Sequence, residues 1–264
     1  MAIPKTIHYC WFGGNPLPEL AQKCIASWRK FLPDYEIKEW NESNYDVRKI
    51  QYIAQAYDAK KYAFVSDYAR FDILYQYGGV YFDTDVEVIK DLRPIIERGA
   101  FIGVEKGQKP LLNAGLGIAS PAASGIYREI LDSYQNEHFI TTDGSLNLKT
   151  VVTRVSDLFK AHGFVEQDIM QFVADTMIYP SEYFCPKDFD TEKLEITENT
   201  YSIHHYDGSW MPAYVVAQQQ MKIKINNLFG RTFFSKSLFY LFCVVYRIKT
   251  DGLKKAIKHY VRRK

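Results

Sequence analysis

The feature that most constrains this chain is a run of eight residues, Gly78 to Asp85, with the sequence GGVYFDTD. The two glycines end an apolar helical pattern that begins at Ser66, a suitable N-cap residue. Val80 to Phe82 then form the short apolar run of a buried strand, and two acids separated by one threonine follow it. Open α/β sheets bind ligands beyond the carboxyl ends of their strands, so this run predicts a ligand site in an α/β fold.

The segments around this run alternate between strand and helix patterns. Residues 6–12 and 36–40 read as strands, with a helical pattern between them, so the chain opens as the β-α-β start of a doubly wound sheet. We expect further strands at residues 101–104, 116–119, 176–179 and 201–205, and helices at 66–77, 122–136 and 146–162.

Charge is distributed unevenly along the 264 residues. Residues 222–264 hold 12 basic residues and one acid, a net charge of +11, whereas the first 221 residues hold 21 bases and 30 acids, a net charge of −9. Helical patterns also dominate after residue 212. We therefore expect an α/β domain over residues 1–211 and a basic helical C-terminal extension over residues 212–264.

Several classes of protein are disfavoured by the remaining composition. The four cysteines have no C-x-x-C spacing, which argues against a disulfide framework or a zinc site and suits a reducing compartment. The N-terminus runs directly into a strand pattern and has no signal-peptide character. The longest apolar run, Leu238 to Tyr246, has 9 residues, whereas a spanning helix needs about 20. We expect a cytoplasmic protein.

The acids after the predicted strand indicate a cation site. Alternate residues of an extended chain point the same way, so Asp83 and Asp85 can meet at one ion. Carboxylates suit Mg²⁺ or Mn²⁺, which could neutralise the charge left on a diphosphate when a bond to it breaks. Asp67 and Arg70 share a helix face and can contact the same ligand. The alternative is a surface loop with an ion pair, but the joint pattern is much longer than D-x-D alone.

With these motifs the chain resembles the sugar-nucleotide-binding core of retaining GT-A glycosyltransferases. It is most similar to glycosyltransferase family 32, the capsular polysaccharide and yeast outer-chain mannosyltransferase type, and also to the catalytic domain of the large clostridial glucosylating toxins. The resemblance covers about the first 120 residues and a patch near residue 205. It implies a GT-A (Rossmann-like) nucleotide-sugar-binding domain with a mostly helical C-terminal part.

The resemblance implies roles for five residues of the first motifs. Trp11 would stack on the nucleotide base, although a core tryptophan is the alternative. Asp67 would bind hydroxyls of the donor sugar, and Arg70 would contact donor sugar and phosphate. Ser66 would lie near the ribose or base, and Tyr81 beside the diphosphate.

The resemblance also implies a metal site made from two distant segments. Asp85 would ligate the metal directly, and Asp83 would reach the ribose or sugar and touch the metal through water. The later segment, Ile203 to Trp210, has the form of the C-terminal metal and diphosphate loop. His205 matches best and His204 stays open, against the alternative of a core histidine. Because imidazole suits Mn²⁺ better than Mg²⁺, we favour Mn²⁺.

Four further positions belong to this interpretation. Ser209 and Trp210 would close over the diphosphate. Asn113 lies where such enzymes place groups against the transferred sugar, although the glycines after it suit a tight turn equally well. The family often has Thr-Gly-Pro in the next connection, but this chain has Thr142-Asp143-Gly144. Asp143 could face the acceptor or cap a helix.

The predicted function is retaining transfer of a sugar from a nucleoside diphosphate sugar, preferably a UDP-sugar, to a glycan or lipid-linked glycan acceptor in bacterial surface (capsular) polysaccharide synthesis. No residue clearly acts as nucleophile, so we expect front-face attack, in which the departing phosphate helps to deprotonate the acceptor. Two rivals stay open. A nucleotidyl or phosphosugar transferase would also hold metal and diphosphate, but Gly13-Gly14 lacks the basic residues of its phosphate loop. A non-catalytic homologue would bind only sugar nucleotide or membrane.

The basic extension predicts where the enzyme acts. Residues 253, 256, 257, 260 and 261 form one apolar helical stripe flanked by lysines and arginine, and residues 233–242 are rich in phenylalanine. This pattern is typical of an amphipathic region that meets anionic lipid. We therefore expect a peripheral position on the inner face of the bacterial cell membrane. A solvated helical cap or a partner surface is the alternative, and no nucleic-acid motif accompanies the charge.

Overall fold

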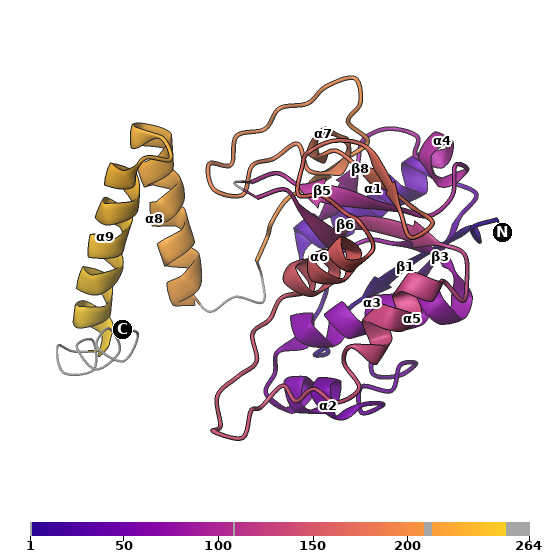
Figure 1. The fold of residues 1–264 in the computed structure, drawn as a ribbon, viewed down its shortest axis with the longest axis horizontal. Coiled ribbons are helices and arrows are strands. Elements are labelled where there is room, and N and C mark those ends of the chain that lie inside the picture. Colours follow the sequence, from indigo (N-terminus) through magenta and orange to yellow (C-terminus); the bar gives the residue numbers. More distant parts are fainter. Residues whose placement is uncertain (1, 108, 209–212, 252–264) are drawn as a thin grey trace. The chain divides into compact units, whose positions relative to one another are not determined.

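The computed structural model describes residues 2–107, 109–208 and 213–251 (Figure 1). Two compact units make up the chain. One comprises Met1–Lys187 and Leu194–Trp210, and the other comprises Asp188–Lys193 and Met211–Lys264. The first unit is a mixed α/β domain and the second is built on two helices, so the predicted fold class is confirmed.

A mixed seven-stranded sheet forms the centre of the first unit. Its spatial order is β2-β1-β3-β6-β5-β8-β7. Parallel pairs join β1 to β2 and β3, and β5 to β8, and the other neighbours are antiparallel. The strands are β1 (Thr6–Cys10), β2 (Glu36–Trp40), β3 (Gly79–Tyr81), β5 (Phe101–Glu105), β6 (Leu111–Ser120), β7 (Gln171–Val173) and β8 (Thr176–Tyr179).

Helices cover both faces of this sheet. Successive strand residues point to opposite faces, so one strand contributes side chains to the packing on both sides. Tyr81 packs in one hydrophobic cluster, whereas its neighbours Val80 and Phe82 pack in the other. The first cluster includes residues of α2 (Gln51–Asp58), α3 (Tyr62–Tyr77), α5 (Gly125–Asp132) and α6 (Val151–Ala161). The second includes residues of α1 (Glu19–Phe31), α4 (Arg93–Ile96) and α7 (Ser181–Phe184).

A separate two-stranded sheet matters most for the site. β4 (Val86–Val88) starts directly after the second acid of the D-x-D motif and pairs antiparallel with β9 (Ser202–His204). Val86 lies opposite His204 in this pairing. The late segment with the two histidines is thereby brought to the end of the first motif.

The expected start of the helix over residues 66–77 was wrong. α3 begins at Tyr62, four residues before Ser66, so Ser66 lies inside the helix and its hydroxyl donates to the Tyr62 carbonyl at 3.2 Å. The helix ends as expected, with Gly78 as C-cap at a φ of +65°. The patterns also missed α2 and the short elements β4, β7, α4 and α7, which have too few residues to show a clear period.

One polar group is buried beside the centre of the sheet. His8 in β1 is 2% exposed, accepts a hydrogen bond at Nδ1 from Trp40 Nε1 (3.1 Å) and faces the Gly78 carbonyl with Nε2 (3.0 Å). A neutral imidazole with its proton on Nε2 satisfies both contacts. Burial lowers the pKa of His8 to about 4, with a further contribution from Lys38.

The second unit is a helical hairpin of α8 (Ala213–Phe229) and α9 (Phe233–Asp251), with residues 188–193 beside it. Lys222 Nζ pairs with Asp190 Oδ1 at 2.5 Å, and Arg231 pairs with Asp188. Among the described residues, no helix has the length and apolar character to cross a bilayer. The apolar stripe expected at residues 253–261 lies outside the described residues.

Candidate active site

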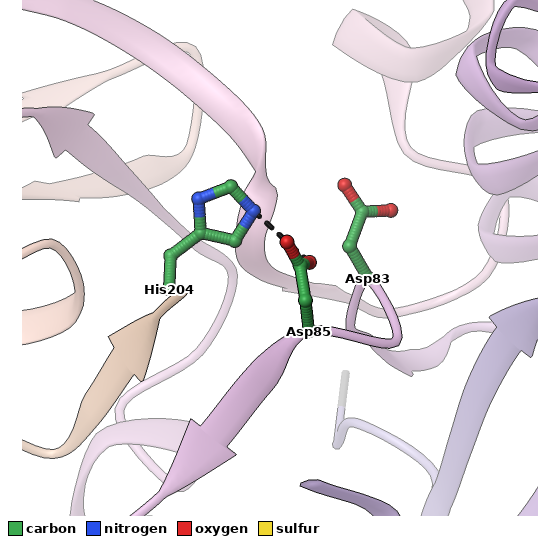
Figure 2. A group of neighbouring side chains, drawn as sticks. All are labelled: Asp83, Asp85 and His204. Carbon is green, nitrogen blue, oxygen red and sulfur yellow. Dashed lines mark ion pairs between the residues drawn. The ribbon is translucent and has the colours of Figure 1, made fainter. Parts of the chain in front are cut away.

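Three side chains from two distant segments form a compact cluster (Figure 2). Asp83 and Asp85 belong to the turn between β3 and β4, and His204 is the last residue of β9. One ligand atom from each lies within 4.8 Å of the others. The pairing of β4 with β9 brings the imidazole to the acids across more than a hundred residues of sequence.

His204, rather than the favoured His205, belongs to this cluster. The two residues follow one another at a strand end, so their side chains point to opposite sides. His204 Nε2 lies 3.1 Å from Asp85 Oδ1, whereas His205 Nε2 lies 2.8 Å from Glu87 Oε2. Lys23 also pairs with Glu87, at 2.8 Å. His205 therefore belongs to a separate polar cluster with Glu87 and Lys23, on the other side of β4.

Asp85 contacts the backbone next to the two histidines as well as the His204 imidazole. Its Oδ2 accepts from the Asp207 amide at 3.0 Å, and its carbonyl accepts from the His205 amide at 3.0 Å. Burial opposes ionisation of this carboxyl, but His204 and the Asp207 amide outweigh burial and lower the pKa of Asp85 to about 2. Asp85 is therefore an anion over the ordinary range of pH.

Arg70 and Asp67 form a buried ion pair behind Asp83. Arg70 Nη2 lies 2.8 Å from Asp67 Oδ1 and 3.3 Å from Asp83 Oδ1, and the Arg70 side chain is only 4% exposed. The Asp67 carboxyl also accepts from the Val151 amide, at the start of α6. Burial raises the pKa of Asp67 to about 6, although Arg70 opposes that rise. Arg70 thus orients two carboxylates.

Tyr81 and β6 complete the surroundings of Asp83. The Tyr81 hydroxyl donates to Asp83 Oδ1 at 3.1 Å, and the Arg70 guanidinium lies 5.0 Å from the Tyr81 ring centroid. Asn113 accepts at Oδ1 from the Gly115 amide at 2.7 Å and is buried. A Cβ on Gly115 would lie 2.3 Å from Asp83 Oδ2. The absence of a side chain at Gly115 therefore makes room for an acid of the cluster.

The remaining predicted positions are spread around this centre. Trp11 directly follows β1, is partly buried against the second hydrophobic cluster, and donates from Nε1 to the Asn15 carbonyl at 2.6 Å. Ser66 is partly buried on α3, one residue before Asp67. Asp143 accepts from the Ser145 amide at 3.1 Å inside its own exposed turn, so it caps no helix. Ser209 and Trp210 lie outside the described residues.

The donor set of the cluster suits a divalent cation. It offers two carboxylates, which suit both Mg²⁺ and Mn²⁺, and one imidazole, which suits Mn²⁺ better than Mg²⁺. His204 Nδ1 is buried and has no hydrogen-bond partner among the described residues, so Nε2 is the ring nitrogen aimed at the acids. Asp83, Asp85 and His204 therefore fit a divalent cation.

Comparison with known proteins identifies the first part of this site. Residues 18–102 match the family model described as the glycosyltransferase sugar-binding region containing a DXD motif. The predicted sugar-binding region is confirmed. The matched residues include Asp67 and Arg70 as well as the two acids of the D-x-D motif. The match ends far before β9.

Two curated relatives from Schizosaccharomyces pombe match over part of their length. Inositol phosphoceramide mannosyltransferase 3 is 32% identical over 109 residues, covering 38% of this chain and 29% of the relative. Inositol phosphoceramide mannosyltransferase 1 is 31% identical over 111 residues, covering 38% and 33%. The chain thus spans about a third of the length of these relatives. Both relatives are named as mannosyltransferases.

Solved glycosyltransferases show a more distant likeness. The PaToxG glycosyltransferase is 19% identical with a TM-score of 0.45, covering 60% of this chain and 69% of that chain. A glycosyltransferase involved in glycosylation of the major capsid of PBCV-1 is 12% identical with a TM-score of 0.45, covering 82% and 99%. The galactosyltransferase LgtC is 12% identical with a TM-score of 0.40, covering 81% and 94%.

Two features of the site were missed from the sequence. The room that Gly115 leaves for Asp83 depends on how β6 lies beside the turn after β3, which no local pattern encodes. Tyr206 packs on His204 at 4.2 Å between ring centroids. Its position two residues after a candidate ligand was the available signal, but only the structure shows where its hydroxyl goes.

Proposed function

We propose that this chain is a metal-dependent glycosyltransferase that moves a hexose from a nucleoside diphosphate sugar to an acceptor hydroxyl with retention. The observation that carries the proposal is the cluster of Asp83, Asp85 and His204 within 4.8 Å, next to a matched sugar-binding region. A surface D-x-D loop would have no reason to collect a buried imidazole from a strand far along the chain.

The residues divide the work between charge and position. A divalent cation held by Asp83, Asp85 and His204 would supply neutralisation of the charge that develops on the leaving diphosphate. Arg70 is buried, so it acts by holding Asp83 and Asp67 in place rather than by reaching the ligand from an open surface. Asp67, with its pKa raised to about 6, can accept from sugar hydroxyls when ionised.

The identities of the donor sugar and of the acceptor are further parts of this proposal. From the motifs we propose that the chain belongs to family 32 and uses a UDP-sugar. The mannosyltransferase relatives support a mannosyl donor equally well. The names of these relatives describe sugar transfer to inositol phosphoceramide, a membrane lipid. We propose a lipid-linked or glycan acceptor, within bacterial surface polysaccharide synthesis at the cytoplasmic face of the membrane.

A thermal-shift panel tests the proposal. UDP, GDP and their hexose conjugates are added to the full chain with and without Mn²⁺ or Mg²⁺. A ligand at 100 times its Kd adds about 2.7 kcal/mol of stability, which corresponds to roughly 5–10 °C for a chain of this size. We expect a shift that requires both nucleotide and cation. Absence of any cation-dependent shift, together with no release of nucleoside diphosphate, would contradict the proposal.

The helical hairpin is proposed as the membrane contact. Apolar side chains gather where α8 meets α9: Phe233 is 87% exposed and Leu228 is 76% exposed. Lys224 and Lys236 are exposed on the same two helices. Each basic residue near an anionic surface contributes about 1 kcal/mol, and aromatic side chains favour the membrane interface.

Vesicle sedimentation tests this contact. The full chain should sediment with vesicles containing anionic lipid at low salt, and a Leu228→Ser/Phe233→Ser variant should bind at least fivefold less. Phe172→Ser is the matched control, because this phenylalanine is 66% exposed on β7 of the other unit. Equal binding of all three proteins would refute the assignment of the hairpin.

A further inference from the structure

Tyr206 follows the cluster histidine by two residues and has an unusual backbone. Its φ is +57°, in the left-handed region that few side chains other than glycine and asparagine adopt. In this conformation its ring lies edge-on to the His204 ring, with 4.2 Å between centroids and 74° between planes. A residue in an unfavourable conformation persists only when its contacts hold it there.

Those contacts come from two other parts of the first unit. The Tyr206 hydroxyl donates to Glu105 Oε1 at 3.1 Å, at the end of β5, and lies 2.9 Å from Cys185 Sγ, just after α7. Cys185 is fully buried.

His204 lacks the usual means of orienting a ligand ring. A metal-binding histidine ordinarily donates from its second ring nitrogen to a carboxylate, a carbonyl or water, which fixes the ring. Here His204 Nδ1 is buried without a hydrogen-bond partner in the described part of the chain. With no hydrogen bond at Nδ1, the direction of Nε2 is set by its contact with Asp85 together with packing, and Tyr206 is an aromatic ring placed against the imidazole.

We propose that Tyr206 is a positioning residue that holds the His204 imidazole toward the cation, while Glu105 and Cys185 hold the Tyr206 hydroxyl. The inference rests on the proposed function, because it concerns the cation of that site. In this role Tyr206 acts on the cation site through His204. Its effect passes through the angle of one ring.

The experiment measures Mn²⁺ binding to the full chain by electron paramagnetic resonance of the free ion, which does not depend on turnover. We expect Tyr206→Ala to weaken Mn²⁺ affinity about tenfold, the loss typical for partners that orient a ligand. Tyr206→Phe keeps the ring and loses both hydroxyl contacts, and we expect a loss of about threefold. If Tyr206→Ala does not fold, Tyr206→Phe decides the question.

A double-mutant cycle shows whether the effect passes through the histidine. In a His204→Ala background, Tyr206→Ala should change Mn²⁺ affinity less than twofold. Tyr183→Ala is the matched control, because Tyr183 is also partly buried against the second hydrophobic cluster and contacts Tyr201 instead. It should lower the melting temperature and leave Mn²⁺ affinity unchanged.

The outcomes separate this inference from the proposed function. Unchanged Mn²⁺ affinity in both Tyr206 variants overturns the positioning role, as does an equal loss in the His204→Ala background. Failure of the unmodified chain to bind Mn²⁺, alone or with UDP and GDP, would instead contradict the cation site itself.

Discussion

The substitution Gly115→Ala tests the geometry of the cluster without removing a charged group. A Cβ at this position of β6 would lie 2.3 Å from Asp83 Oδ2 and 3.1 Å from Asn113 Oδ1. Real Cβ atoms essentially never approach another heavy atom within 3.0 Å. The φ of Gly115 is outside the left-handed region, so alanine itself is not strained. The whole conflict therefore falls on the neighbouring side chains.

The size of the effect follows from these distances. Going from 2.3 Å to at least 3.0 Å moves the Asp83 oxygen by 0.7 Å or more. That carboxylate is also held by the Tyr81 hydroxyl at 3.1 Å and by Arg70 at 3.3 Å, and the shift weakens both contacts. A misplacement of about 1 Å in a group that positions a substrate costs about 100-fold in rate. We expect a loss of that order in kcat/KM.

The assay is release of nucleoside diphosphate from the best donor of the thermal-shift panel, with Mn²⁺ affinity measured in parallel. Gly125→Ala is the matched control, because a Cβ at Gly125 meets nothing within 4 Å and its φ is ordinary. This control should keep its activity within twofold. If Gly115→Ala also keeps activity and Mn²⁺ affinity within twofold, Asp83 does not need its observed position and the reasoning fails.

Three further predictions follow from the same structure. Asp85→Asn should lower transfer activity at least 100-fold while the protein remains folded by circular dichroism, since Asp85 is the acid in contact with the imidazole. His204→Ala should abolish cation-dependent activity whereas His205→Ala should keep it within tenfold; the reverse result would return the ligand role to His205. Because the pKa of His8 falls from 6.5 to about 4 on folding, its contribution to stability is complete above pH 6.5 and is lost toward pH 4, so unmodified protein should lose about 3 kcal/mol more unfolding free energy over that range than His8→Gln in urea titrations.

The parts of the fold with long periodic patterns could be predicted from the sequence. Strands near residues 6–12 and 36–40 and the helix that ends before Gly78 lie where the patterns placed them, within a few residues. α3 starts earlier than expected because Tyr62 is as compatible with a helix as Ser66, and a good capping residue does not force a helix to begin. Short elements such as β4 and β7 depend on pairing with distant strands, which a local pattern does not contain.

The site was predictable in its residue types but not in its contacts. The spacing of Asp83 and Asp85 sufficed to propose that they share a cation, although the structure places them in a turn rather than in the extended segment that the argument assumed. Choosing between His204 and His205 needs the register of β9 on β4, since one residue of shift exchanges the two faces. The buried position of Arg70 is likewise a tertiary fact, because a helix pattern shows which face it shares with Asp67 but not how deep that face lies.

Asp85 connects the turn after β3 to the end of β9 and the residues that follow it. One carboxylate oxygen meets His204, the other accepts from the Asp207 amide, and the Asp85 carbonyl accepts from the His205 amide. A cation held by this carboxylate would share it with the Asp207 amide. By linkage, a ligand that shifted Asp207 away from this carboxylate would also change the affinity of the cation site.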